Sequence, residues 1–191
     1  MLDGLKGLDT SLFLLINGAH HPVLDFIMYW ASDRFIWIPF YLYLLWLISR
    51  SINDKSKLVP LLLTIGLLIV TSDQLTVVLF KNTVHRLRPC HRVDLRALIH
   101  LVGGCGGEYG FLSSHAANCF AIASMLVVSF NNALPRLKYI LFPWALFVGY
   151  SRIYNGVHFP ADVLAGALFG ALLGYVFSIL YKRVESRKSK V

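Results

Sequence analysis

The sequence predicts an all-α protein, a polytopic membrane helix bundle with about five transmembrane helices preceded by N-terminal interfacial helices. Hydrophobic residues make up 57% of the 191 residues, and the mean hydropathy is +0.63, too apolar for an ordinary water-soluble domain. Apolar runs of helical length alternate with short polar segments that carry most of the charge. We therefore expect one membrane-embedded domain over residues 1–191.

The order of the elements follows from these runs. Residues 1–34 mix acidic and apolar side chains at helical spacing, which is typical of helices lying at a membrane surface. We assign 35–182 to the transmembrane bundle, with spans at 35–49, 58–80, 116–134, 139–150 and 163–181, and 183–191 to a polar tail. The first span is short, because fifteen residues cover only about 22 Å of a bilayer core of about 30 Å.

The second span contains an acidic residue, Asp73. A carboxylate inside a membrane is costly unless it has a partner. Asp73 either supports Lys81, about two turns later, or makes a hydrogen bond to another helix, which is the interpretation we favour.

The net charge of +8 does not indicate nucleic-acid binding, because the basic residues flank apolar runs and form no separate basic arm. In a five-span arrangement, ten of the 18 Lys and Arg residues fall on one side: Arg50, Lys55, Lys57, Arg136, Lys138, Lys182, Arg183, Arg187, Lys188 and Lys190. The positive-inside rule makes this side, with the C-terminus, cytoplasmic.

The most informative stretch is 151–162, SRIYNGVHFPAD. His158 and Asp162 are four residues apart around Pro160, a spacing that predicts imidazole and carboxylate one turn apart at a helix start. A carboxylate bonded to one ring nitrogen leaves the other nitrogen free to attack an electrophile, and Arg152 offers a planar fork for phosphate oxygens. The alternative is an interfacial histidine among capping and snorkelling residues.

Two more polar motifs precede apolar runs. In KNTVHRLRP, at 81–89, Lys81 and Arg88 are seven residues apart, which predicts two cations on one helix face. In FLSSHA, at 111–116, Ser113 and His115 lie at a predicted helix start, where free N–H groups favour an anion.

Taken in order, the three motifs resemble the signature of the type 2 phosphatidic acid phosphatase family, which also contains the vanadium haloperoxidases. The family patterns are K-x6-RP, PSGH and SR-x5-H-x3-D. The first and third match this sequence residue for residue. The second departs from the pattern, with Leu112 in place of proline and Ser114 in place of glycine, while Ser113 and His115 are retained.

The resemblance implies a metal-independent and cofactor-independent hydrolysis, because fixed cations take the place of a divalent ion. The implied phosphate ligands are Lys81, Arg88, Arg152, the Ser113 hydroxyl and the backbone N–H of Ser114. The implied catalytic groups are His158 as nucleophile, Asp162 as its orienting carboxylate, and His115 as the acid for the leaving oxygen and then the base for water.

A site at the membrane surface favours a phosphate or diphosphate on a lipid anchor, and we rank undecaprenyl diphosphate first. The alternatives are a lipid A phosphate and phosphatidylglycerophosphate or phosphatidate. The run GGEYGFLSSH, at 106–115, resembles lipid phosphatases of Bacteroides-like bacteria, which makes lipid A the main rival. We expect a bacterial inner-membrane protein with its site facing the periplasm.

Two other classes are weighed against this one. A non-catalytic lipid transporter explains the spans and a basic vestibule, but it gives no reason for His115, His158 and Asp162 to accompany three cations. A vanadate-dependent haloperoxidase uses a similar anion pocket, but those relatives are generally soluble. The sequence leaves the oligomeric state open.

The chain has three cysteines. Cys119 lies in an apolar run, which predicts a small buried side chain. Cys90 and Cys105 lie in the polar loop on the side assigned as outer, and we expect a disulfide there, worth about 3 kcal/mol in the chain-entropy picture. The alternative is a pair of free thiols.

Overall fold

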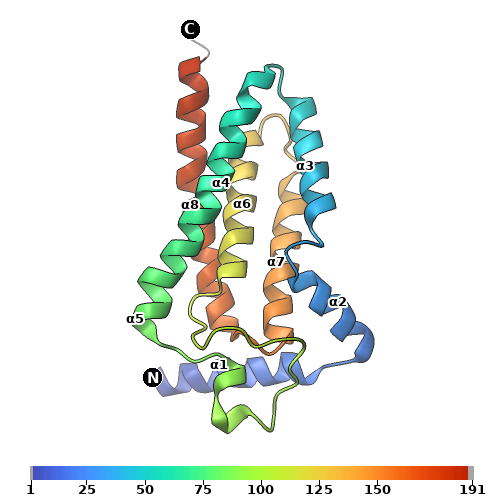
Figure 1. Ribbon diagram of the computed structural model, residues 1–191, viewed down its shortest axis with the longest axis vertical. Coiled ribbons are helices and arrows are strands. Elements are labelled where there is room, and N and C mark those ends of the chain that lie inside the picture. The colour runs from blue at the N-terminus through green and yellow to red at the C-terminus, as the bar shows by residue number, and fades with distance from the viewer. Residues whose placement is uncertain (1, 189–191) are drawn as a thin grey trace.

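The computed structural model describes residues 2–188, which form a bundle of long helices closed at one end by two further helices (Figure 1). Within that range there is no strand, and only an isolated bridge joins Leu87 to Tyr109. The predicted tail residue Lys190 lies outside the described residues, as do the side chains of Arg187 and Lys188. The all-helical fold class is confirmed.

Five long helices correspond to the five predicted spans: α3 Ile38–Ser51, α4 Leu58–Leu75, α6 Ser114–Phe130, α7 Lys138–Tyr154 and α8 Pro160–Lys188. The helix α8 continues through residues 183–188, which we had assigned to a separate tail. Two segments, Lys55–Val84 and Pro160–Ser186, are long and apolar enough to cross a membrane, and α6 is apolar but shorter. The count of five spans therefore stays a prediction.

The helix α4 continues past Leu75 through a π-helical stretch, η2 Thr76–Lys81, and a short helical turn, α5 Asn82–Val84. It ends at His85, whose φ of 49° is left-handed. Arg88 lies beyond this end, so the prediction that Lys81 and Arg88 share one helix face is wrong. The remaining short elements are the 3₁₀ turns η1 Lys55–Lys57, η3 Pro89–His91 and η4 Val93–Leu95.

The tightest helix pair is α6 with α8, and it positions the site. Gly166, Gly170 and Gly174 recur every four residues along the face of α8 that meets α6. A Cβ on Gly170 would lie 2.0 Å from the carbonyl oxygen of Ala117. Small residues at this spacing allow the two backbones to touch, as in other membrane helix pairs, and bring the starts of both helices together.

The two N-terminal helices are α1 Leu2–Gly18 and α2 Pro22–Ser32, and α1 lies across one end of the bundle (Figure 1). Asn17, fully buried, donates to the carbonyl oxygens of His100 and Tyr154, both at 2.7 Å. These bonds attach α1 to α7 and to the polar loop. Helices in 1–34 were expected, while their position at a membrane surface stays a prediction.

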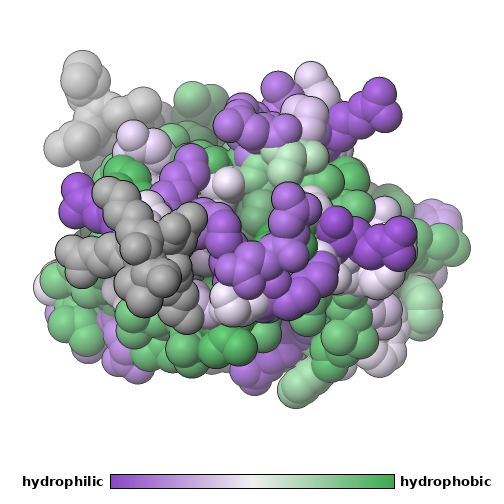
Figure 2. All heavy atoms as spheres, turned by 90° about the horizontal axis from the view of Figure 1, so that it is seen from above, coloured by the Kyte–Doolittle hydropathy of each residue, from purple (hydrophilic) through white to green (hydrophobic). Residues whose placement is uncertain are grey.

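The opposite end of the bundle carries the connections 51–57 and 131–137 together with the end of α8. Figure 2 shows hydrophilic side chains gathered over this end and apolar side chains around its rim. The exposed cations here are Arg50, Lys55, Arg136, Lys138, Lys182 and Arg183. The three signature motifs lie at the other end, beside α1 (Figure 1).

Candidate active site

His158 lies in the short connection between α7 and α8. The backbone N–H groups of Val157 and His158 both donate to the carbonyl oxygen of Arg152, at 3.2 Å each, which turns the chain back on itself. His158 is 1% exposed. The start of α8 at Pro160 was expected, but His158 precedes the helix, so the two residues do not share a helical turn.

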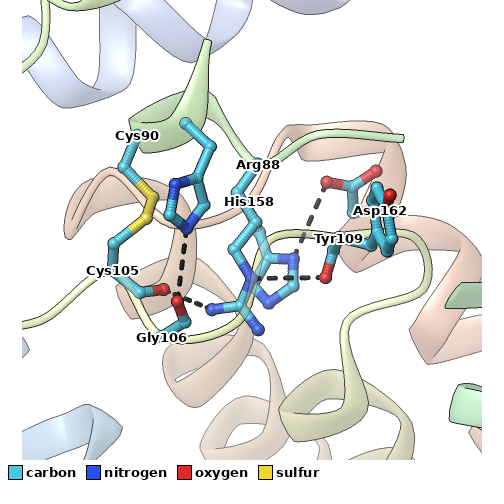
Figure 3. Close-up of a disulfide and its surroundings, with 8 residues drawn as sticks. Arg88, Cys90, Cys105, Gly106, Tyr109, His158 and Asp162 are labelled. Carbon is cyan, nitrogen blue, oxygen red and sulfur yellow. Dashed lines mark hydrogen bonds and ion pairs between the residues drawn. A yellow bond between two sulfur atoms is a disulfide. The ribbon is translucent and has the colours of Figure 1, made fainter. Parts of the chain in front are cut away.

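The predicted hydrogen bond between His158 and Asp162 is not formed in the structure. Nδ1 of His158 lies 3.6 Å from Oδ2 of Asp162, longer than a hydrogen bond (Figure 3). That carboxylate oxygen accepts from the backbone N–H of Phe159 at 3.0 Å. The two side chains nevertheless face each other, and catalytic hydrogen bonds are commonly long in a site without substrate.

Asp162 has a second partner that sequence reasoning missed. Nη1 of Arg86 donates to Oδ1 of Asp162 at 2.7 Å, and the Arg86 guanidinium stacks 4.2 Å from the Phe159 ring. Nη2 of Arg86 donates to Asp9 of α1, whose other oxygen accepts from the backbone N–H of Ala161 at 2.8 Å. Arg86 thus joins the N-terminal helix to the carboxylate beside His158.

The first two motifs meet through Ser114. Nζ of Lys81 donates to Oγ of Ser114 at 2.9 Å, and Oγ1 of Thr76 lies at the same distance from that hydroxyl. Ser114 occupies the position where the family pattern has glycine, so this chain has a hydroxyl that orients Lys81. We had expected only its backbone N–H to contribute.

Ser113 and His115 flank that residue at the start of α6. Ser113 is fully buried, and within the described residues its hydroxyl has no hydrogen-bond partner. Its backbone N–H donates to the carbonyl oxygen of Asp162 at 3.0 Å, which ties α6 to α8. His115 lies in the first turn of α6, where N–H groups have no partner inside the helix.

The polar loop wraps around Arg88. Its Nη1 donates to the carbonyl oxygen of Cys105 at 2.6 Å, and Cys105 is joined to Cys90 by a disulfide with Cα atoms 6.0 Å apart (Figure 3). Gly106 has a φ of 75°, and a Cβ there would lie 2.9 Å from Nη1 of Arg88. His91 lies close to both sulfur atoms, but these are bonded to each other and are not free to bind a metal.

The charges at this end are unbalanced. Among the side chains that the structure describes, no carboxylate lies at ion-pair distance from Lys81, Arg88 or Arg152, and Nε of Arg152 is buried without a hydrogen-bond partner. Burial lowers the pKa of His158 well below its ordinary value, and Arg152, Arg88 and Lys81 lower it further. Burial also lowers the pKa of Arg88. The result is a neutral imidazole beside three unpaired cations, an arrangement suited to an anion.

Asp73 lies in the last turn of α4, eight residues before Lys81. Its Oδ1 accepts from Nδ2 of Asn118 at 2.9 Å. This is the hydrogen bond between helices that we favoured from the sequence.

Comparison with known proteins agrees with the three motifs. The model of the PAP2 superfamily matches residues 57–186. The chain belongs to this superfamily. It is 33% identical to a lipid A 4'-phosphatase of Bacteroides thetaiotaomicron, over 98% of this chain and 83% of that protein. It is 32% identical to a lipid A 4'-phosphatase of Porphyromonas gingivalis, over 94% of this chain and 75% of that protein. An undecaprenyl-diphosphatase of Sulfolobus acidocaldarius is 30% identical over 89% of the chain and 77% of that protein.

Solved structures of the superfamily share the fold. Aquifex aeolicus LpxE superposes with a TM-score of 0.61 at 34% identity, over 89% of this chain and 94% of that one. A transmembrane PAP2-type phosphatidylglycerolphosphate phosphatase of Bacillus subtilis superposes with a TM-score of 0.69 at 22% identity, over 95% and 88%. The chain is an enzyme of this group, a lipid phosphatase.

Proposed function

We propose that this PAP2 enzyme removes a phosphate monoester from an acylated glucosamine lipid of the lipid A type, through a phosphohistidine and without a divalent metal. The observation that carries the chemistry is the buried neutral imidazole of His158 facing three unpaired cations. The likeness to two lipid A 4'-phosphatases supports the substrate. The sequence alone had ranked undecaprenyl diphosphate first, and the relatives favour the lipid A alternative.

In the first step, Lys81, Arg88 and Arg152 bind the phosphoryl oxygens and offset the charge that develops on them. The unused hydroxyl of Ser113 and the free N–H groups at the start of α6 add hydrogen bonds. Ser114 acts through Lys81, whose ammonium group it holds.

Bond making and breaking involve the two histidines. Nε2 of His158 attacks phosphorus, while Asp162 faces the Nδ1 side and stabilises the charge that the ring acquires. Burial first, and then the nearby cations, lower the pKa of His115 to about 3, and a bound phosphate dianion offsets those cations so that His115 takes up a proton. His115 gives this proton to the leaving oxygen, which departs as an alcohol. His115 then takes a proton from water, the resulting hydroxide attacks the phosphohistidine, and phosphate leaves with free His158 restored.

The proposed orientation places this site on the periplasmic side of the bacterial inner membrane. The exposed cations at the opposite end of the bundle support a cytoplasmic position for that end and for the C-terminus. Proteolysis of the C-terminal segment in sealed inverted vesicles tests the orientation, and a protected segment would contradict it.

The test of function is a substrate panel presented at equal surface concentration in detergent micelles. The panel contains lipid A, undecaprenyl diphosphate, phosphatidylglycerophosphate and phosphatidate, and released phosphate is measured with and without EDTA. We expect the highest kcat/KM on lipid A, no loss in EDTA, and competitive inhibition by vanadate. Preference for undecaprenyl diphosphate would overturn the substrate, and no hydrolysis of any lipid would overturn the function.

A further inference from the structure

A cavity of about 810 Å³ adjoins the site, between α3, α4 and α6. Most of its wall is apolar and includes Leu44, Ile48, Leu61, Ile65 and Ile122. Ser114 and His115 also line it, so the cavity is continuous with the phosphate site on the His115 side. A volume of this size with such a wall suits the hydrocarbon part of a lipid.

Three charged side chains interrupt the apolar wall: Asp33, Arg34 and Asp73. Oδ1 of Asp33 accepts from the backbone N–H of Phe35 at 2.6 Å. Asp73 is exposed and lines the cavity, and Asn118, three residues after His115 on the same face of α6, holds its Oδ1. Among the described side chains and backbone groups, the other carboxylate oxygen has no hydrogen-bond partner. A carboxylate left open beside apolar side chains at membrane depth is costly, and such residues typically face a substrate path.

The position of the cavity identifies which part of the substrate meets Asp73. His158 attacks from one side of phosphorus and His115 protonates the oxygen that leaves on the other, so the leaving group lies on the His115 side. Asp73 and Asn118 lie in the cavity wall on that side.

We propose that Asp73, oriented by Asn118, accepts a hydrogen bond from an N–H or O–H group on the leaving group, as an acylated amino sugar offers, and disfavours anionic leaving groups. The inference rests on the proposed function and deepens it. A prenyl diphosphate releases a prenyl phosphate, whose negative charge comes close to the carboxylate. A sugar phosphate releases a neutral alcohol with donors beside it.

The test measures kcat/KM for three probes. The first is a diacylated glucosamine phosphate, whose leaving group carries N–H and O–H donors. The second is farnesyl diphosphate, with an anionic leaving group, and the third is dodecyl phosphate, with neither feature. The variants are Asp73→Asn, which keeps the shape, and Asp73→Ala, and the matched control is Gln74→Ala, one residue away on α4 and not part of the cavity lining.

Asp73→Ala is expected to lower kcat/KM on the sugar phosphate about tenfold and to raise it on farnesyl diphosphate about tenfold. Dodecyl phosphate is expected to change less than about twofold. Asp73→Asn should raise the diphosphate rate while size-exclusion chromatography shows a normally folded protein, which keeps the test valid if the alanine variant does not fold. Gln74→Ala should leave all three rates unchanged.

Two failures are distinguishable. Equal changes on all three probes in both Asp73 variants would show a purely structural residue and overturn the inference, while leaving the proposed function intact. No phosphate release from any probe by the unmodified protein would overturn the proposed function and the inference with it.

Discussion

The two ends of the bundle carry the same kind of residue in different surroundings. At the end formed by 51–57 and 131–137, Arg50, Arg136 and Lys138 are exposed, and Lys57 pairs with Glu185 at 2.8 Å. At the site end, Lys81, Arg88 and Arg152 are half-buried and face no carboxylate at ion-pair distance within the described residues. The exposed cations at the first end are hydrated, whereas Lys81, Arg88 and Arg152 have no negative partner and can bind an anion.

The number of basic residues on each face is therefore a weak guide to their role. Ten Lys and Arg residues fall on the predicted cytoplasmic side and eight on the side of the site, a small difference. The surroundings of the two groups nevertheless differ. Exposed cations cost nothing to keep and serve as topology signals. A buried cation without a partner is costly, so it indicates a bound negative charge.

The largest effect is expected at His158, the proposed nucleophile. His158→Ala is expected to lower kcat by about four orders of magnitude or more, because no other side chain can form the covalent intermediate. Acid-quenched protein incubated with labelled substrate should carry phosphate on His158 and none in the variant. Near-normal turnover by His158→Ala would contradict the mechanism.

Exchanging arginine for lysine at both ends tests the contrast directly. Arg88→Lys and Arg152→Lys should each lower kcat/KM about a hundredfold, because an ammonium group cannot reproduce two parallel hydrogen bonds to phosphate. Arg136→Lys, at the opposite end, should change it less than about twofold. Similar losses at both ends would show that burial does not distinguish the two groups of cations.

Removing the link between α1 and the site should have an intermediate effect. Arg86→Ala is expected to lower kcat about tenfold with KM little changed, because Asp162 loses the group that holds its carboxylate towards His158. Arg86→Lys should recover part of the rate, and Asp9→Asn should have a smaller effect. A rise in KM with unchanged kcat would place Arg86 in substrate binding instead.

The smallest effect concerns pH. In the proposed mechanism the neutral imidazole of His158 is the nucleophile, and burial lowers its pKa, so activity should persist below the ordinary histidine pKa of about 6.5. Arg88→Gln removes one of the cations that lower this pKa, so the acidic limb of kcat/KM should move to higher pH. An unchanged limb in this variant would show that Arg88 does not act on His158 electrostatically.

Much of the fold, and most residues of the candidate site, could be predicted from local sequence. Long apolar runs predicted the five long helices, because a membrane favours helices whose backbone groups are satisfied internally. The three motifs predicted a site from residues that the fold brings together, and the loop position of Cys90 and Cys105 suggested the bridge between them. These features depend on residues close in sequence or on strict spacing.

Other features were decided only by the tertiary structure. Helical spacing placed Arg88 on the same helix as Lys81, but a left-handed residue at His85 ends that helix before Arg88. The sequence by itself could not pair Arg86 with Asp162 and Asp9, which are 76 and 77 residues away. Helical periodicity relates neighbours three and four residues apart, whereas these contacts depend on how α1, α6 and α8 pack. Local sequence predicted most groups of the candidate site, and helix packing determined which of them touch.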